Sequence, residues 1–434
     1  MTVETVTLGC RLNFAEGETI AALAPAGEEW VVVNSCAVTN EAVRQTRQAI
    51  RRAHRRRPEA RILVTGCAAE LEPAAFAAMA GVARVVGNSG KLHAFSSTPA
   101  RPEPVEGRSG MDGAGTVLRQ AQGERIWLGD RVELGERVGL GGDVMASPLV
   151  AAGMLHKVKS FVAVQTGCDH RCTFCTIWQA RGASVSLPFE AIRDAITREI
   201  DRGAREIVLT GVDITDYEGG LGRLCQRLLA AEPRLQRLRL SSLDGVEMDD
   251  ALFELIAGEP RLMPHFHLSL QAGDDMILKR MKRRHSRANA VRTVERIKTA
   301  RADASIGADL IAGFPTETED MAANTLKLIA DCEIVAAHVF PFSARRNTPA
   351  ARMPQLPGQV VKARAARLRS AAAKQRSRWL DSQIGSVQAV LIEGDGTGHS
   401  DNFAPVALAG GIRGQTGLAH LIGRNGDKLA AEWA

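Results

Sequence analysis

The sequence predicts an α/β protein with three folded parts: a small parallel α/β domain, a partial barrel of six β-α units and a small β-barrel at the carboxyl end. Three observations support this prediction. Strand and helix patterns alternate over the first ninety or so residues, six apolar β-rich runs recur along the middle of the chain, and the last part is glycine-rich and strand-like. At 434 residues, the chain is long enough for about two to four domains.

The first predicted domain spans residues 1–93. Its expected strands are 5–8, 30–33, 61–64 and 84–86, with alanine- and arginine-rich helical stretches between them. This alternation is typical of a small parallel sheet. Residues 94–125 lose this periodicity and gain proline, glycine and charge, so we expect a flexible insertion there, followed by a linker over 126–154.

The second predicted domain spans residues 155–375. Its six β-rich runs are FVAVQTG, EIVLTGVD, LRLSSLD, HFHLSLQA, ASIGADLIAGF and VAAHVFPFS. Helical patterns such as 190–201 and 288–299 separate them, which predicts an open, partial barrel with its chemistry at the carboxyl ends of the strands. A helix over 359–380 leads into the last predicted domain, a small β-barrel over 376–434.

Composition narrows the class of protein. No stretch approaches 18 uninterrupted apolar residues, and the first residues lack a basic segment followed by an apolar core, so we expect a cytoplasmic protein with no membrane partner. Eight cysteines are too few for a disulfide scaffold in a chain of this length, and they favour metal or redox chemistry. Lysine and arginine exceed aspartate and glutamate by 55 to 49, which is compatible with a polyanionic partner.

Three cysteines follow the first strand of the predicted partial barrel. Cys168, Cys172 and Cys175 have C-x3-C-x2-C spacing, so their thiolates can converge on one soft metal centre. A zinc site with His170 as fourth ligand is the simpler interpretation, but His170 lies too close to its cysteine neighbours for easy tetrahedral closure. An iron–sulfur cube with three thiolate ligands would leave one iron open to a small molecule.

This motif, with Phe174 before its last cysteine, resembles the radical S-adenosylmethionine superfamily. The resemblance implies that S-adenosylmethionine chelates the open iron and that one electron cleaves it to a 5′-deoxyadenosyl radical. Four strand-end polar residues are then candidates for contact with this cofactor, although such residues are as often turn or cap groups. They are Asp213, Ser242, Gln271 and Asp309. Asp213 stands where relatives often have asparagine.

Three further cysteines each end a predicted strand of the first domain. Cys10, Cys36 and Cys67 should therefore lie on one edge of a parallel sheet. A single buried cysteine is usually core packing, but three repeats of one placement favour a ligand site. The segments TLGCRLN, NSCAVTNEAVRQTRQAIRR and VTGCAAE resemble the methylthiotransferases, and most closely the branch that acts on N6-threonylcarbamoyladenosine in tRNA. Apart from 94–125, the resemblance spans nearly the whole chain.

The resemblance implies a complete set of cofactors and partners. The six cysteines would hold two [4Fe–4S] clusters, and S-adenosylmethionine would be both methyl donor and radical source. The product would carry a methylthio group on carbon 2 of adenosine 37, beside the anticodon, and no side chain would act as acid or base. A carboxyl-terminal TRAM domain is also implied. We further expect an electron donor such as a flavodoxin or ferredoxin, and a monomer.

Arginine-rich helices are the predicted tRNA surface. Arg44, Arg47, Arg51 and Arg55 would align on one helix face, among seven arginines and no acid in residues 44–57. Arg364 and Arg367, on the helix over 359–380, extend the prediction. A solvated helix face is the ordinary explanation for such a run. Residues 384–434 hold three basic and five acidic side chains, so the last barrel is not expected to bind RNA by charge.

Two groups of alternatives remain open. The same chemistry could act on isopentenyladenosine in tRNA or on an aspartate side chain of a ribosomal protein. A different class would be a non-catalytic iron–sulfur or zinc RNA-binding protein. The six β-α units and the incomplete local ligand set argue against this last class.

Overall fold

A computed structural model describes residues 3–25, 27–95, 150–155, 158–346 and 348–434. The predicted insertion and linker, 94–125 and 126–154, lie almost entirely outside these residues. The chain divides into two compact units. Unit 1 comprises residues 1–151, 167–183 and 344–351, and unit 2 comprises 152–166, 184–343 and 352–434.

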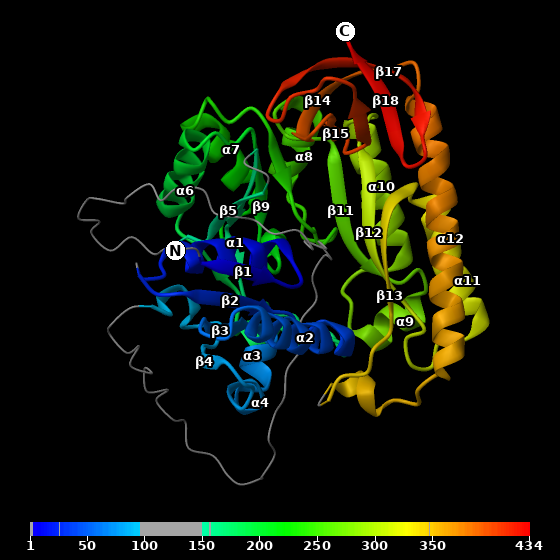
Figure 1. Ribbon diagram of the computed structural model, residues 1–434. Coiled ribbons are helices and arrows are strands. Elements are labelled where there is room, and N and C mark those ends of the chain that lie inside the picture. Colours follow the sequence, from blue (N-terminus) through cyan, green and yellow to red (C-terminus); the bar gives the residue numbers. More distant parts are fainter. Residues whose placement is uncertain (1–2, 26, 96–149, 156–157, 347) are drawn as a thin grey trace. The chain divides into compact units, whose positions relative to one another are not determined.

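Unit 1 is built on a four-stranded parallel sheet in the order β1-β2-β3-β4 (Figure 1). These strands are β1 (Glu4–Thr7), β2 (Trp30–Ser35), β3 (Arg61–Gly66) and β4 (Val82–Val85). The helices between them are α1 (Arg11–Ala22), α2 (Asn40–Arg56), α3 (Cys67–Leu71) and α4 (Pro73–Ala77), followed by the short η1 (Lys91–His93). Buried aliphatic side chains such as Ile20, Val32 and Leu63 form its core. The predicted parallel α/β sheet is confirmed.

Unit 1 also contains two segments from later in the sequence. The 167–183 segment includes α5 (Ile177–Arg181), and the 344–351 segment includes the start of η3 (Pro349–Arg352). The two segments are joined by a backbone hydrogen bond of 3.0 Å from the Ala350 amide to the Thr173 carbonyl. All three members of the C-x3-C-x2-C motif therefore belong to the same unit as the amino-terminal sheet.

Unit 2 contains the six predicted strands of the partial barrel. They are β6 (Lys159–Ala163), β9 (Glu206–Thr210), β10 (Leu238–Leu240), β11 (His265–Gln271), β12 (Ser305–Ala312) and β13 (Ile334–Pro341). They form two parallel ladders, β6-β9-β10 and β11-β12-β13, which single bridges such as Leu243 to Leu268 connect. The sequence did not predict β5 (Ala152–Leu155), which pairs antiparallel with β6.

Helices alternate with these strands, as expected for β-α units. They are α6 (Phe189–Asp201), α7 (Leu221–Ala231), α8 (Asp250–Gly258), α9 (Asp275–Met281), α10 (Arg287–Ala300) and α11 (Glu319–Asp331). Side-chain caps set several starts: Asp249 accepts from the Leu252 amide, and Ser286 and Asn289 form a capping box. Two-residue strands β7 (Gln165–Thr166) and β8 (Val185–Ser186) and the short η2 (Ile214–Asp216) complete this region.

The carboxyl-terminal part is a long helix followed by a closed β-barrel. Helix α12 (Gly358–Gln383) packs along β13 and ends beside the barrel (Figure 1). The barrel strands are β14 (Val387–Gly394), β15 (Thr397–Ser400), β16 (Pro405–Leu408), β17 (Thr416–Asn425) and β18 (Lys428–Trp433), which close in the order β14-β15-β16-β18-β17. Leu380, Val390 and Leu421 are fully buried in its core. The predicted small β-barrel is confirmed.

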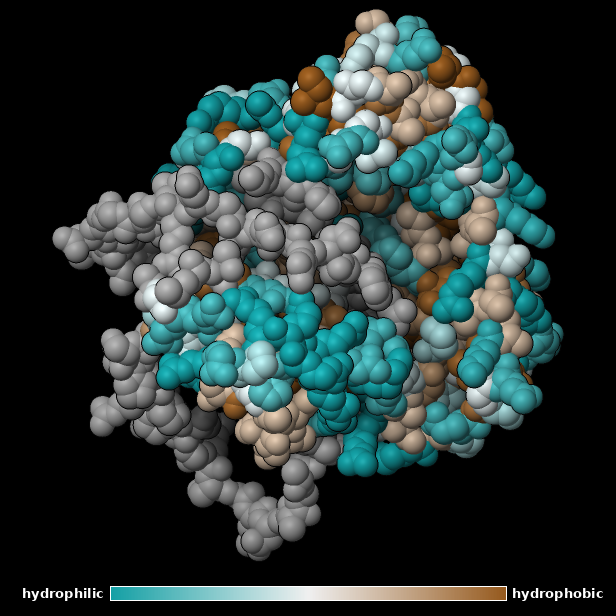
Figure 2. Space-filling view, in the orientation of Figure 1, coloured by the Kyte–Doolittle hydropathy of each residue, from teal (hydrophilic) through white to brown (hydrophobic). Residues whose placement is uncertain are grey.

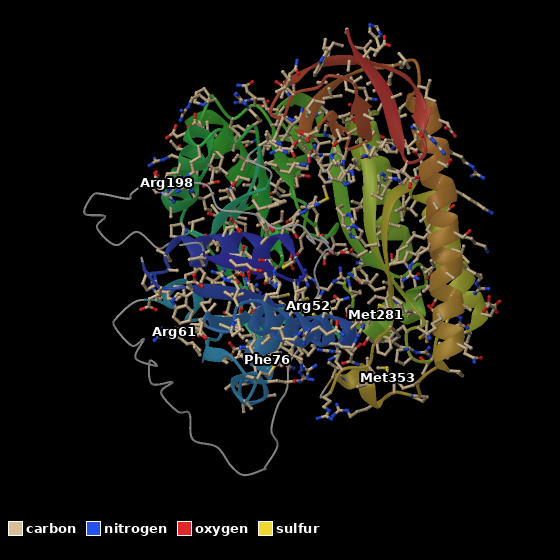
Figure 3. The ribbon with its side chains drawn as sticks, in the orientation of Figure 1. Arg52, Arg61, Phe76, Arg198, Met281 and Met353 are labelled. Carbon is tan, nitrogen blue, oxygen red and sulfur yellow. The ribbon has the colours of Figure 1, made fainter. Side chains whose placement is uncertain are left out.

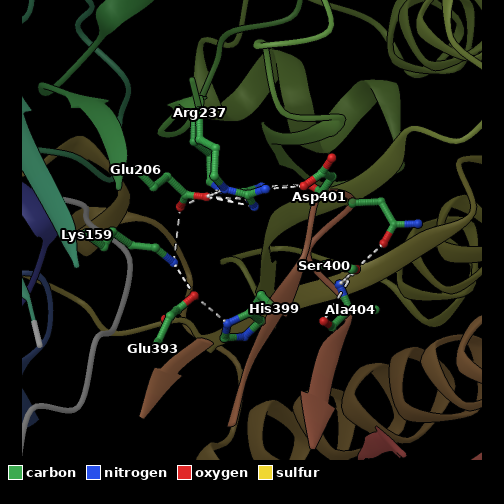
Figure 4. Close-up of polar contacts among 10 residues, drawn as sticks. Lys159, Glu206, Arg237, Glu393, His399, Ser400, Asp401 and Ala404 are labelled. Carbon is green, nitrogen blue, oxygen red and sulfur yellow. Dashed lines mark hydrogen bonds and ion pairs between the residues drawn. The ribbon is translucent and has the colours of Figure 1, made fainter. Parts of the chain in front are cut away.

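Buried and partly buried charges fasten this barrel to the amino ends of the parallel strands (Figure 4). Glu206, the first residue of β9, pairs with Lys159 of β6 at 3.2 Å and receives two 3.0 Å bonds from Arg239 of β10. Lys159 reaches Glu393 of the barrel at 2.8 Å, and Arg237 pairs with Asp401 in the loop after β15. We call Lys159, Glu206, Arg237, Arg239, Glu393 and Asp401 the docking network.

Aromatic stacking adds to this attachment. Phe403, in the same loop, lies between His265 of β11 at 4.8 Å and His399 of β15 at 4.5 Å, measured between ring centroids. The Arg239 guanidinium lies 4.8 Å from the Phe403 ring centre. The segment GHSDNF, 398–403, thus joins the barrel to the rest of unit 2.

Among the helices of the described ranges, none is long and apolar enough to span a membrane.

Candidate functional site

The three amino-terminal cysteines lie on one edge of the unit 1 sheet. Thr7, Asn34 and Thr65 are aligned across β1, β2 and β3, and the cysteines follow these positions in the chain. Cys10 is the N-cap of α1, Cys36 follows β2 directly and Cys67 is the first residue of α3. Cys36 and Cys67 are buried and Cys10 is partly exposed. The structure thus places the trio together, as expected from the parallel sheet.

Two glycines let the backbone approach these cysteines. Gly9 has φ +102°, and a Cβ there would lie 2.7 Å from the Cys36 sulfur. Gly66 has φ +88°, and its Cβ would lie 2.3 Å from the Asn34 Oδ1 atom. Any other residue would be strained at both positions and would also clash.

The electrostatics of the trio suit a metal ligand set. Burial raises the pKa of the Cys36 thiol to about 12, and the neighbouring Cys67 and Cys10 also act to raise it. Burial likewise raises the pKa of Cys10, while the Arg181 guanidinium acts to lower it. Clustered buried thiolates therefore need a metal or nearby cations for stability. Three thiols that meet at one sheet edge fit a soft metal centre such as an iron–sulfur cluster.

The second cysteine trio lies on the 167–183 loop. The Cys175 amide donates to the Cys172 carbonyl at 3.1 Å, and the Ile177 amide lies 3.4 Å from the Cys175 sulfur. The Cys168 amide donates to the Gly182 carbonyl at 3.2 Å, which closes the loop on itself. Amide hydrogen bonds to sulfur are a usual feature around cluster thiolates. The loop can therefore present three thiolates to one cluster.

A buried group of charges connects the two trios within unit 1. Arg181, on α5, donates to both carboxylate oxygens of Glu16 at 2.7 and 2.9 Å, and to Asn13 Oδ1 at 2.8 Å. Lys91 contacts the same carboxylate at 2.5 Å and donates to Asn88 at 2.8 Å. The three charged side chains are at most 5% exposed. We call Glu16, Lys91 and Arg181 the bridging triad.

Neighbouring asparagines tie this triad to the cysteine loops. Asn13 donates to the Leu8 carbonyl at 2.8 Å and to the Ser35 carbonyl at 3.1 Å, just before Cys10 and Cys36. Asn88 donates to the Ala180 carbonyl at 2.6 Å, and its amide nitrogen lies 4.0 Å from the Cys67 sulfur. Sequence reasoning assigned no role to these residues. The only signal was that Asn13 lies in the segment TLGCRLN, which carries part of the family resemblance.

The four predicted cofactor residues all belong to unit 2, near the carboxyl ends of parallel strands. Asp213 follows β9 and Ser242 follows β10, while Gln271 ends β11 and Asp309 lies within β12. Gln271 is 1% exposed and has φ +66°, a conformation that non-glycine residues adopt at a cost. Asp213 accepts a 2.8 Å bond from Thr215. Their contact with S-adenosylmethionine stays a prediction.

A histidine pair surrounds one of these candidates. Asp309 Oδ1 lies 3.2 Å from both His267 Nε2 and His338 Nδ1, on three adjacent strands. The two imidazoles stack at 4.6 Å between centroids. Burial would raise the pKa of Asp309, but the two histidines hold it below its usual value. Asp309 is therefore an anion fixed inside unit 2, and sequence reasoning missed both histidines.

The arginines of α2 divide into paired and unpaired groups. Hydrophilic side chains gather over this helix, where Arg52 is labelled (Figures 2 and 3). Arg44 pairs with Glu41, and Arg47 pairs with Glu72. Arg51, Arg52 and Arg55 are exposed and form no ion pair with any residue of the described ranges. The prediction that the arginines of residues 44–57 have no acidic partner is therefore wrong in part. Acids from outside this range neutralise several of them.

The two predicted RNA-contacting arginines of α12 differ in exposure. Arg364 is 8% exposed and donates to Glu317 Oε2 at 2.9 Å, so its guanidinium points into unit 2. Arg367 is exposed and pairs with Glu319. A buried, paired guanidinium is poorly placed to reach a phosphate, whereas Arg367 could exchange its partner for one.

Two family models match parts of this chain, and several relatives match nearly all of it. Residues 162–329 match the model of the Radical SAM superfamily, and residues 2–87 match Uncharacterized protein family UPF0004. The chain is 41% identical over 431 residues to Threonylcarbamoyladenosine tRNA methylthiotransferase MtaB of Rickettsia prowazekii, covering 97% of this chain and 94% of that protein. It is 30% identical to the protein of the same name from Thermotoga maritima, covering 90% and 86% of the two chains.

A relative with a different name is also similar. The tRNA-2-methylthio-N(6)-dimethylallyladenosine synthase of Erythrobacter litoralis is 30% identical, covering 91% of this chain and 87% of that protein. A radical SAM domain implies a [4Fe–4S] cluster and S-adenosylmethionine, and the C-x3-C-x2-C loop fits that cluster. The chain belongs to the radical S-adenosylmethionine methylthiotransferase family, in the threonylcarbamoyladenosine tRNA methylthiotransferase branch.

Proposed function

We propose that this enzyme adds a methylthio group to carbon 2 of N6-threonylcarbamoyladenosine at position 37 of tRNA. The observation that carries the proposal is the grouping of two cysteine trios in unit 1: Cys10, Cys36 and Cys67, and Cys168, Cys172 and Cys175. A generic radical enzyme needs only the second trio. The 41% identity to the Rickettsia prowazekii protein favours this substrate over the dimethylallyl one.

Each trio would hold one [4Fe–4S] cluster with an open iron. When bound, the clusters and S-adenosylmethionine would supply the electron, the radical, the sulfur and the methyl group of the reaction. The chain's own task is to hold and shield these groups. Cys36, Cys67 and Cys172 are at most 8% exposed, which limits water at the thiolates. Carbon 2 of adenine is not acidic enough for ordinary acid–base chemistry, so no side-chain base is required.

We assign phosphate contact to the exposed arginines of α2, supported by Arg367 of α12. The substrate would be tRNA carrying threonylcarbamoyladenosine, and the electron donor a small protein such as a flavodoxin or ferredoxin. We further propose a cytoplasmic monomer. Residues 384–434 carry a net negative charge, so the last barrel would contribute shape and local contacts more than charge.

Nucleoside analysis tests the substrate. In tRNA from a strain lacking the gene, mass spectrometry should show loss of methylthio-threonylcarbamoyladenosine and accumulation of its unmethylthiolated precursor. Loss of the methylthio-isopentenyl nucleoside instead would assign the enzyme to the other branch. If that strain instead lacks the methylthio group on an aspartate of a ribosomal protein, the substrate is that aspartate.

Anaerobic reconstitution tests the cofactor set. Two clusters correspond to about eight irons per chain. Cys67→Ala should lower this to about four and abolish methylthiolation while S-adenosylmethionine cleavage continues. Cys225→Ala is a matched control, because Cys225 is also fully buried but lies in α7 of unit 2. Zinc in place of iron, or loss of both activities in Cys67→Ala, would contradict the scheme.

A further inference from the structure

We propose that Arg181 is a positioning residue for the centre formed by Cys10, Cys36 and Cys67. It fixes the 167–183 segment to this centre and supplies positive charge to its thiolates. The inference rests on the proposed function, because it assumes that these three cysteines hold a cluster. It assigns a task to a side chain from a later part of the sequence at a site whose ligands all come from the first 67 residues.

The geometry around Arg181 is that of a built anchor. Its guanidinium forms a two-pronged bond to Glu16 and a third bond to Asn13. Side-chain exposure is 3% for Arg181 and 5% for Glu16. A buried, bidentate arginine holds its position far more strictly than an exposed one. Helix α5, the end of the C-x3-C-x2-C loop, is thereby fixed to α1.

The same contacts extend to each amino-terminal cysteine. Through Asn13, Arg181 is linked to the backbone before Cys10 and before Cys36. On the other side, the Ala180 carbonyl holds Asn88, whose amide nitrogen is 4.0 Å from the Cys67 sulfur. A displacement of α5 would therefore disturb all three ligand loops. This arrangement also couples the two cysteine trios mechanically.

The charges of the bridging triad point to an anionic neighbour. Arg181 and Lys91 contribute two positive charges against the single carboxylate of Glu16. Glu70 accepts a 2.8 Å hydrogen bond from the backbone N–H of Asn88. Its side chain is only partly buried, so water can solvate it. Buried cations in excess are costly unless an anion is close. Three thiolates on a cubane cluster would provide this anion, since their combined charge is negative.

Arg345 makes a parallel contribution from another segment. It is 8% exposed, lies in the 344–351 part of unit 1 and donates to Asn40 at the start of α2. Its charge acts on Cys36, whereas that of Arg181 acts on Cys10 and Cys67. Both buried guanidiniums near the trio thus come from sequence outside the amino-terminal domain. The centre is completed only when these segments fold together.

Redox titration can test the role of Arg181. The parent protein is the full chain with Cys168, Cys172 and Cys175 each changed to Ala, so that only the amino-terminal cluster contributes. In this parent, Arg181→Gln should make the midpoint potential more negative, because a positive charge that favours the reduced cluster is lost. Glu16→Gln breaks the same ion pair but removes a negative charge, so it should shift the potential in the opposite direction.

Arg181→Gln and Glu16→Gln both break the same ion pair. Opposite shifts of the midpoint potential in these two variants are not expected if Arg181 has a purely structural role. Arg181→Lys keeps the charge but loses the two-pronged geometry, so its potential should stay near that of the parent. Its amide hydrogen exchange over 177–183 should be faster. Arg239→Lys is the matched control: it alters a buried bidentate Arg–Glu pair in unit 2 and should leave the potential unchanged.

The outcomes separate this inference from the proposed function. If the parent holds no cluster, both the proposed cofactor set and this inference fail. If Arg181→Gln and Glu16→Gln retain the parent's potential, or shift it in one common direction, this inference alone is overturned. If instead tRNA nucleosides are unchanged in the strain lacking the gene, the substrate assignment fails and the potentials still decide the role of Arg181.

Discussion

The bridging triad of unit 1 and the docking network of unit 2 are both groups of largely buried charges, yet the balance of positive and negative charge differs between them. The docking network contains three cations, Lys159, Arg237 and Arg239, and three anions. The bridging triad contains two cations and one anion, and lies beside cysteines. The first is complete in itself and fastens two parts of a fold. The second has an excess of positive charge, which indicates a site for an anionic group.

The strongest test of this contrast compares Glu206→Gln with Glu16→Gln. Removing Glu206 leaves Lys159, Arg237 and Arg239 without their shared anion, and should lower the free energy of unfolding by about 3–5 kcal/mol. Urea unfolding with and without reconstituted clusters measures this. The loss in Glu206→Gln should be the same in both states. In Glu16→Gln the loss of stability should be smaller in the cluster-loaded protein, because the cluster would still provide an anion for Arg181 and Lys91. Equal losses with and without clusters would contradict the difference between the two groups of charges.

Acid should weaken the docking network in a defined range of pH. Burial acts to raise the pKa of Glu393, but Lys159 and His399 together outweigh this effect and lower the pKa to about 2. An unfolded glutamate titrates near pKa 4.3, so this carboxylate contributes stability that is full above about pH 5 and is lost as the pH falls towards 2. The contribution is on the order of 2–3 kcal/mol.

The measurement is the urea midpoint of wild type and Glu393→Gln between pH 6 and pH 3. The wild type should be more stable at pH 6, and the difference should shrink as the pH falls. A difference that stays constant over this range would mean that the ion pair with Lys159 is not its cause.

A smaller effect is expected at the glycine beside Cys67. Gly66→Ala places a Cβ 2.3 Å from Asn34 Oδ1 at φ +88°, which should cost about 1–3 kcal/mol from backbone strain, with the clash added. Iron bound by the amino-terminal trio should fall with it. Gly27→Ala is the control, since Gly27 has φ +93° but no atom within 4 Å of its would-be Cβ. Equal iron content in the two variants would reject the steric argument.

The smallest effect concerns single charges on the surface. A variant with Arg51, Arg52 and Arg55 changed to Ala should reduce the salt dependence of tRNA binding by about 0.7–0.9 log units for each phosphate that these arginines neutralise. Changing Arg44 and Arg47 should have less effect, because Glu41 and Glu72 already neutralise them. Filter binding over a range of salt measures both. Identical slopes in the two variants would show that pairing on α2 is irrelevant to RNA.

Much of the fold and of the ligand set follows from local pattern. Cys10, Cys36 and Cys67 could be grouped from sequence because each follows a strand, and parallel strands in one sheet place such residues on one edge. Arg181 and Lys91 could not be grouped with them. Nothing in a one-dimensional pattern states that Arg181 of α5 bonds Glu16 of α1, which lies 165 residues earlier in the chain. Nor does it state that Lys91 reaches the same carboxylate.

Charge shows the same division. The sequence alone determined that α2 is an arginine-rich helix, since helical spacing depends only on neighbouring residues. Tertiary structure decided which arginines are neutralised, because Glu4, Glu29 and Glu72 come from other elements. It also decided that Arg364 is buried against Glu317. Strands, helices and cysteine spacing are set by short-range periodicity, whereas the partners of buried and surface charges depend on contacts that only folding creates.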